Sequence, residues 1–122
     1  MYSPFQYCNS IGAYVVEIDN AAEQEVIGNL ASDTMMIGFD SLGRSEPGDF
    51  HWTNSGRKVS DIFECWGASE PNNLGGFERC GNLYALTWPS ACGVGRGWND
   101  IGCDSDLSFM CEKDPVPPHQ LI

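Results

Sequence analysis

The segment with the most evident chemical potential is residues 69–78, SEPNNLGGFE. It carries two carboxylates, Glu70 and Glu78, and two amides, Asn72 and Asn73, around a single proline. All four side chains present oxygen atoms. Such a segment is either an ordinary polar turn, in which proline is common, or a site that holds a ligand.

Calcium is the ion that suits these side chains, because it takes about six to eight oxygen ligands from carboxylates, amides and carbonyls in flexible geometry. A cis bond before Pro71 would reverse the chain and bring Glu70 and Asn72 onto one cation, and X-Pro bonds adopt the cis form at modest cost. From the residues alone, a calcium site and a polar loop with a turn-forming proline are equal alternatives. The candidate ligands lie in two segments: Glu70, Asn72, Glu78, Asn99 and Asp100.

No combination of residues points to an enzyme. The chain has no Gly-x-Ser-x-Gly elbow, and His51 and His119 have no evident nucleophile partner. Residues 93–97, GVGRG, lack the strand-to-helix context of a phosphate-binding loop. Carboxylates flanked by amides suit a metal shell better than the proton-transfer pair of a glycosidase. We therefore expect a non-enzyme.

Composition and charge exclude several classes of partner. The chain has 122 residues, which suits one domain, and a net charge of −11, which would repel nucleic acid and anionic membranes. The acidity would attract a cation, or it could serve solubility alone. No apolar run approaches the roughly 18 residues of a membrane-spanning helix. Residues 1–6 do not resemble a secretory signal, so either a signal has been removed or the chain is a piece of a longer protein.

Six cysteines indicate disulfides and an oxidising compartment. Their number is even, and no C-x-x-C pair suggests zinc or redox chemistry. A metal site would require closely spaced cysteine and histidine residues, which are absent from the sequence. Three disulfides are therefore expected, although the residue positions alone leave their pairing open. The cysteines are Cys8, Cys65, Cys80, Cys92, Cys103 and Cys111.

The first third of the chain predicts regular elements. Residues 3–10 are expected to form a short helix, residues 13–18 a strand, and residues 35–39 a second strand. Between the strands, Asn20 is a good N-cap for a helix over residues 20–31, in which apolar residues recur at helical spacing.

The rest of the chain is irregular. Residues 40–98 are rich in Gly, Ser, Asn, Asp and Pro, and a stretch of that length is uncommon unless it is functional or stapled. Residues 114–122 are rich in proline and predict an extended tail or linker. Short strand-like pieces lie at 50–52, 83–86, 97–100 and 109–112.

Four short motifs, taken in order, give the chain a resemblance to a known family. They are Met-Ile-Gly-Phe at 36–39, Glu-Pro-Asn at 70–72, Trp-Asn-Asp at 98–100 and Phe-Met-Cys-Glu at 109–112. Together with the cysteines, they resemble the calcium-dependent, carbohydrate-recognition type of C-type lectin-like domain over roughly residues 8–113. Each motif is weak alone, and Met36 stands where the family has tryptophan.

The resemblance implies an α+β fold: a C-type lectin-like fold of small antiparallel sheets, one or two helices and a long, disulfide-pinned loop region. The domain would span residues 1–113 and be short at its N-terminus. The strand that normally pairs with residues 109–112 could then be missing, which would leave an exposed edge. The family pattern implies disulfides Cys8–Cys111 and Cys80–Cys103. Cys65 and Cys92 are extra to that pattern, and we predict a local Cys65–Cys92 bridge, with an intermolecular disulfide as the alternative.

The same resemblance implies that Ca2+ is held by the five candidate ligands, including Asp100 through its side chain and backbone. Glu70, Asn72, Glu78 and Asn99 would also bind the sugar, with carboxylates accepting and amides donating hydrogen bonds. Two vicinal hydroxyls would complete the calcium shell. The Glu-Pro-Asn order implies mannose-type glycans, that is mannose, N-acetylglucosamine, glucose or fucose.

A second calcium site, present in some family members, is expected to be missing. It uses an acidic residue directly after the position of Glu78, and Arg79 stands there. The nearby oxygen donors Asn73, Asp40 and Glu46 would not compensate for that cation.

The leading hypothesis is a secreted or extracellular, calcium-dependent lectin that forms a homo-oligomer or part of a larger extracellular protein. It would neither bind nucleic acid nor insert into a membrane. The alternative is a lectin-like domain that binds protein or serves a structural or adhesion role without sugar. Tyr84 and Trp98 are expected in the core, whereas Trp88 could equally contact sugar.

Overall fold

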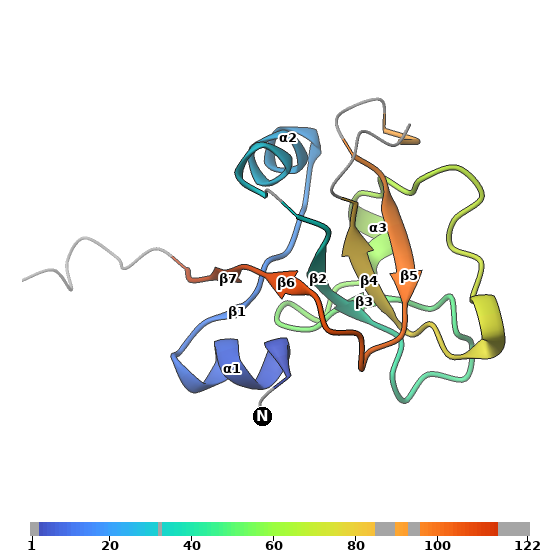
Figure 1. Ribbon diagram of the computed structural model, residues 1–122, viewed down its shortest axis with the longest axis horizontal. Coiled ribbons are helices and arrows are strands. Elements are labelled where there is room, and N and C mark those ends of the chain that lie inside the picture. Colours follow the sequence, from blue (N-terminus) through green and yellow to red (C-terminus); the bar gives the residue numbers. More distant parts are fainter. Residues whose placement is uncertain (1–2, 32, 85–89, 93–95, 115–122) are drawn as a thin grey trace, which may run out of the picture.

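The computed structural model describes residues 3–31, 33–84, 90–92 and 96–114, and within these it is an α+β domain (Figure 1). Trp88 and the expected tail beyond residue 114 lie outside them. The helices are α1 (Pro4–Ser10), α2 (Ala21–Leu30), α3 (Val59–Ile62) and the 3-10 helix η1 (Leu74–Gly76). The strands are β1 (Tyr14–Val15), β2 (Met35–Asp40), β3 (His51–Trp52), β4 (Cys80–Leu83), β5 (Trp98–Ile101), β6 (Ser108–Phe109) and β7 (Cys111–Glu112).

Local capping explains the first two helices. Ser3 Oγ accepts from the Gln6 N–H (3.2 Å), and Gln6 Oε1 accepts from the Ser3 N–H (3.0 Å), which forms a capping box. Asn20 Oδ1 accepts from the Glu23 N–H (2.9 Å), so the predicted N-cap of α2 is confirmed. The single turn of α3 and the short η1 were not expected from the sequence. The described residues therefore form more helices than the one or two that were predicted.

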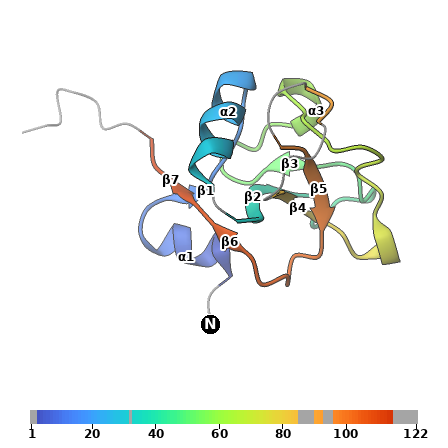
Figure 2. The same ribbon diagram turned by 45° about the horizontal axis from the view of Figure 1, so that its top comes forward.

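Strand β2 is the centre of the main sheet, whose order is β3-β2-β4-β5 (Figure 2). Its residues 35–39 are buried. Gly81 in β4 faces the ring of Phe39, which leaves no room for a side chain there. The expected antiparallel pairing holds for β1–β7, β2–β3, β2–β4 and β4–β5, and β6 adds one short parallel pairing to β2, with Met35 opposite Ser108.

Strand β1 is shorter than the predicted strand at 13–18, because its continuation bonds to two different elements. The Val16 N–H donates to Met110 O (3.0 Å), and Val16 O accepts from the Gly38 N–H (2.8 Å). Val16 therefore links the small β1–β7 sheet to β2 instead of extending one ladder.

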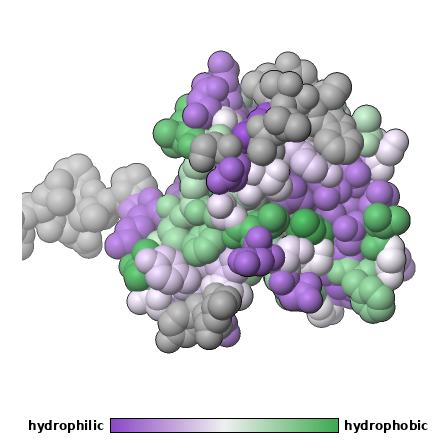
Figure 3. All heavy atoms as spheres, viewed as in Figure 1, coloured by the Kyte–Doolittle hydropathy of each residue, from purple (hydrophilic) through white to green (hydrophobic). Residues whose placement is uncertain are grey.

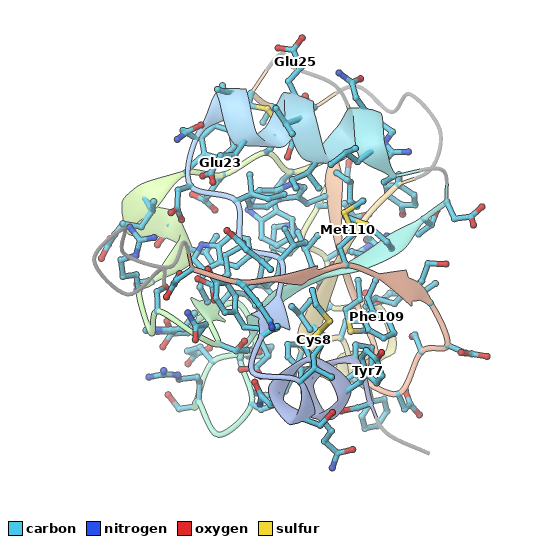
Figure 4. All side chains as sticks on the ribbon, turned by 90° about the vertical axis from the view of Figure 1, so that its left-hand side faces the viewer. Tyr7, Cys8, Glu23, Glu25, Phe109 and Met110 are labelled. Carbon is cyan, nitrogen blue, oxygen red and sulfur yellow. A yellow bond between two sulfur atoms is a disulfide. The ribbon has the colours of Figure 1, made fainter. Side chains whose placement is uncertain are left out.

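The predicted strand at 109–112 splits in two. Phe109 ends β6 and packs edge-on against Tyr7 of α1 (5.8 Å between centroids), whereas Met110 packs against the main core on the side of α2 (Figure 4). The chain then pairs with β1, with Val15 opposite Cys111. Strand β1 thus covers one edge of β7, and within the described ranges no strand pairs with its other edge.

The main core is a cluster of aromatic rings that supports β5. Phe39, Trp52, Trp66 and Trp98 lie with ring centroids 5.2–5.7 Å apart in several pairs. Trp98 is fully buried, and its Nε1 donates to Gln24 Oε1 of α2 (2.9 Å). Its expected core position is confirmed, whereas Tyr84 is only half-buried.

Three disulfides close the fold, and all six cysteines are used. Cys8–Cys111 joins α1 to β7, and Cys80–Cys103 joins β4 to the segment after β5. The predicted local bridge Cys65–Cys92 is confirmed, in place of the intermolecular alternative, and it leaves no described cysteine free. Among the helices that the structure describes, none has the length and apolarity needed to cross a membrane.

Candidate functional site

The candidate ligands gather around the site loop, residues 69–78, which lies on the side of the main sheet remote from α1 (Figures 1 and 2). The Glu70–Pro71 bond is cis, as predicted. Ser69 (φ 67°) and Asn73 (φ 48°) have left-handed conformations on either side of it. The chain therefore reverses direction between the two candidate ligands Glu70 and Asn72.

Asp100 attaches this loop to the sheet. It lies in β5 opposite Gly81 and is only 1% exposed. Its carboxylate accepts from the Asn72 N–H (3.0 Å) through Oδ1 and from the Asn73 N–H (2.6 Å) through Oδ2. The structure thus brings Asp100 together with a segment that lies 27–28 residues earlier in the chain.

Glu78 joins the same cluster from the other end of the loop. Its Oε1 accepts from the Leu74 N–H (2.8 Å), which also donates to Asn72 Oδ1 (3.2 Å). The side-chain oxygens of Asn72 and Glu78 therefore converge on one backbone donor. Gly75 and Gly76 have φ values of 76° and 82°, a conformation that glycine adopts without strain, and they allow the tight turn of η1.

Asn99 is the predicted ligand with the weakest link to this cluster. It precedes Asp100 in β5, and its Nδ2 donates to Asn82 Oδ1 of β4 (3.1 Å) rather than to the site loop. Its roles in binding metal and sugar therefore remain predictions.

The site concentrates negative charge. Burial, a hydrogen bond with Asp100 and the charges of Asp100 and Glu78 together raise the pKa of Glu70 to about 7, and burial is the largest of these causes. Burial and the charge of Asp100 also raise the pKa of Glu78. In addition, Glu70 Oε1 is a buried atom with no hydrogen-bond partner among the described residues. Buried oxygens and uncompensated carboxylates are the features that a bound cation would satisfy.

The donor set fits calcium better than a transition metal. Within the described ranges, no group of three or more His, Cys, Asp or Glu side chains is placed to hold a metal ion by itself. A metal here would depend on amide and backbone carbonyl oxygens beside the carboxylates, and that mixed oxygen set is one that calcium accepts. The residues present therefore fit a calcium ion, which Glu70, Asn72, Glu78 and Asp100 would hold.

Comparison with known proteins identifies the family. Residues 2–113 match the family described as the Lectin C-type domain. The chain belongs to the C-type lectin domain family. Since its relatives are C-type lectins and not enzymes, the expectation of a non-enzyme is confirmed.

Particular relatives agree with this assignment. Human C-type lectin domain family 4 member K is 33% identical over 119 residues, a match that covers 95% of this chain and 33% of that protein. The chain thus spans about a third of the length of that relative. The human scavenger receptor C-type lectin carbohydrate-recognition domain superposes with a TM-score of 0.73 at 26% identity, covering 91% of this chain and 80% of that one. The C-type lectin domain of murine dendritic cell inhibitory receptor 2, solved in complex with N-glycan, has a TM-score of 0.63 at 26% identity, covering 88% and 74%.

Arg79 of this C-type lectin domain has a role that its sequence position did not reveal. Its Nη1 donates to the backbone carbonyls of Ser41 (2.9 Å) and Arg44 (3.0 Å). The guanidinium thereby holds residues 41–44 against the start of β4. The absence of a second calcium site remains a prediction.

The lectin domain also exposes two large apolar side chains that sequence reasoning did not single out. Leu74 is 73% exposed and Phe77 is 83% exposed, on either side of the glycines of η1. Figure 3 shows hydrophobic surface beside hydrophilic surface on this flank of the molecule. The sequence did contain a signal for this exposure, because Leu74 and Phe77 are apolar residues in a glycine-rich loop between the candidate ligands Asn72 and Glu78.

Proposed function

We propose that this C-type lectin domain binds mannose-type glycans in a calcium-dependent manner. The observation that supports this most strongly is the convergence of Glu70, Asn72 and Glu78 around the buried carboxylate of Asp100. One buried oxygen of Glu70 in that cluster has no partner in the described part of the chain.

Each residue has a defined task in this proposal. Asp100 holds the site loop in place through the N–H groups of Asn72 and Asn73. The carboxylates of Glu70 and Glu78 accept hydrogen bonds from sugar hydroxyls, and the amides of Asn72 and Asn99 donate them. A bound calcium ion would supply countercharge and coordination sites for two vicinal hydroxyls.

The order of the hydrogen-bond acceptor and donor on either side of Pro71 sets which sugar is preferred. With a glutamate before Pro71 and an asparagine after it, the pair suits the equatorial 3- and 4-hydroxyls of mannose and related sugars. Exchanging the acceptor and the donor would favour sugars with a different arrangement of hydroxyls. The reason is that a site whose polar groups match one arrangement of hydroxyls leaves some of those groups unpaired when a sugar with another arrangement binds.

Two further observations support an extracellular glycan receptor. Three disulfides are typical of domains that work in an oxidising compartment. A structural neighbour, murine dendritic cell inhibitory receptor 2, was solved with an N-glycan. We expect weak affinity for a single sugar, raised by multivalency if several domains are linked.

The experiment is retention on immobilised mannose and N-acetylglucosamine, with calcium and with a chelator. We expect retention only in calcium. Equal retention in both buffers would contradict the calcium mechanism. No retention in either would favour the alternative, a domain that binds protein, for which the exposed Leu74 and Phe77 provide an apolar surface.

A paired substitution tests the preference. Glu70→Gln with Asn72→Asp should shift binding from mannose towards galactose. The control is Glu25→Gln with Asn29→Asp, which makes the same chemical change at two exposed positions of α2. An unchanged preference in the first variant, or a shift in the control, would refute the hydrogen-bond argument.

A further inference from the structure

The turn at residues 41–44, which follows β2, is attached to the start of β4 by one residue. Arg79 Nη1 donates to the carbonyl oxygens of Ser41 (2.9 Å) and Arg44 (3.0 Å), and Arg79 O accepts from the Ser41 N–H (2.8 Å). Two carbonyl oxygens of one turn are thus satisfied by a single cationic nitrogen. Bound metal ions can satisfy carbonyl oxygens in the same way, and here a side chain of the protein supplies the positive charge.

Glu78 directly precedes Arg79 and depends on contacts within its own loop. The Glu78 N–H donates to Asn73 Oδ1 (3.1 Å), and Glu78 Oε1 accepts from the Leu74 N–H (2.8 Å). Neither hydrogen bond reaches the main sheet. The first half of the site loop is attached to β5 by Asp100, and its far end is attached beside β2 and β4 at Arg79 (Figure 1). The placement of Glu78 is therefore tied to how firmly Arg79 is held.

The charge of Arg79 and its hydrogen bonds would affect a calcium ion in opposite directions. A positive charge beside the site repels a cation, so removing that charge alone would strengthen calcium binding. The hydrogen bonds hold the end of the loop, and a preorganised site loses less conformational entropy when it binds. Salt screens the repulsion at physiological ionic strength but does not weaken the preorganisation. We therefore expect the hydrogen bonds to have the larger effect.

We propose that Arg79 is a positioning residue for the calcium site, which fixes Glu78 by holding the adjoining backbone against the turn at 41–44. The proposal rests on the proposed function, because it needs a calcium ion that Glu78 helps to bind. In the sequence, the cation at position 79 only disfavours a second ion. In the structure, the same cation supports the binding of the first.

The test is titration calorimetry with calcium chloride and no sugar. Arg79→Met should weaken calcium binding about tenfold, the usual scale for losing a group that orients a metal ligand. Arg79→Lys should stay within about threefold of the unmodified protein, because one nitrogen makes both side-chain hydrogen bonds and an ammonium can replace it. Arg44→Met is the matched control, since it removes an exposed charge from the same turn and keeps the Arg44 carbonyl. Its calcium binding should be unchanged or slightly tighter.

Amide hydrogen exchange in a chelator gives a second readout, which does not depend on bound calcium. In Arg79→Met, the N–H groups of Leu74 and Glu78 should exchange faster, because the end of the site loop is released. In Arg44→Met, they should exchange as in the unmodified protein. Faster exchange of the Ser41 N–H alone would show that Arg79 holds only the turn, and it would overturn the proposal.

The outcomes separate this proposal from the proposed function. Absence of calcium binding by the unmodified protein would overturn both. If the unmodified protein binds calcium, then equal or tighter binding by Arg79→Met, an equal loss in Arg79→Lys, or an equal loss in Arg44→Met would overturn the positioning role alone. Arg79→Gln, which keeps a neutral donor, repeats the titration if Arg79→Met does not fold. Calcium affinity in Arg79→Gln equal to that of the unmodified protein would overturn the positioning role as well.

Discussion

Replacing Asp100 with asparagine tests the assembly of the site most directly, because this one carboxylate connects the site loop to the sheet. It is almost fully buried and accepts from two backbone N–H groups, those of Asn72 and Asn73. An asparagine side chain has a single oxygen acceptor. One of the two N–H groups would therefore face another donor instead of an acceptor.

The magnitude follows from two opposing effects. A hydrogen bond to a charged group contributes about 1.5–3 kcal/mol, and leaving a buried donor unpaired costs about 1–3 kcal/mol. Against this, removing the Asp100 charge relieves repulsion on Glu70, whose pKa is raised partly by that charge. We expect the hydrogen-bond loss to dominate and the free energy of unfolding to fall by about 1–3 kcal/mol at neutral pH without calcium.

The assay is urea unfolding at neutral pH, with a chelator and with calcium. Calcium should stabilise the unmodified protein by mass action, and it should stabilise the Asp100→Asn variant much less. Asp106→Asn, the same change at an exposed position, should stay within about 0.5 kcal/mol of the unmodified protein. A variant at Asp100 that is as stable as the unmodified protein in the chelator, or that gains as much from calcium, would refute the reasoning.

Three further predictions concern pH, the third disulfide and the core. The pKa of Glu70 is raised from 4.5 to about 7 in the folded protein, so its contribution to stability is present below about pH 4.5 and is lost as pH rises through 7. We therefore expect the melting temperature in chelator to fall over this pH range, and calcium to reduce that fall. A melting temperature that does not fall, or a fall that calcium leaves unchanged, would contradict the placement of the Glu70 carboxyl. Removing the bridge with Cys65→Ser and Cys92→Ser should lower the free energy of unfolding by about 3.5 kcal/mol on the chain-entropy estimate for its 27-residue separation, and a change in the urea midpoint near zero would argue against it. Gly81→Ala should destabilise by about 1–3 kcal/mol or more, because its methyl group overlaps the Phe39 ring; normal thermal stability would show that the ring can move aside.

The features that could be predicted are those that neighbouring residues decide. Ser3 and Gln6 form their capping box within one helical turn, and Asn20 caps α2 within three residues. The buried run at 35–39 forms a strand because β-branched and apolar residues suit a central position in a sheet. The cis bond before Pro71 also follows a local signal, the Glu-Pro-Asn motif.

The features that could not be predicted depend on residues far apart in the chain. The segment at 109–112 reads as one strand, yet β6 pairs with β2 and β7 pairs with β1, because two different partners lie along its path. The sequence likewise offers no sign that Arg79 binds the carbonyls of Ser41 and Arg44, since any exposed carboxylate would suit it as well.

The sequence by itself determined the chemistry available to this protein: oxygen-rich side chains at 70–78 and 99–100, six cysteines for an oxidising compartment, and the motifs of a C-type lectin domain. Only the tertiary structure decided which of those groups meet. The β4–β5 register and the disulfides carry Asp100 to the N–H groups of Asn72 and Asn73, and burial in that assembly leaves one Glu70 oxygen without a partner. Residue types set what can bind, whereas long-range packing sets where the binding groups converge.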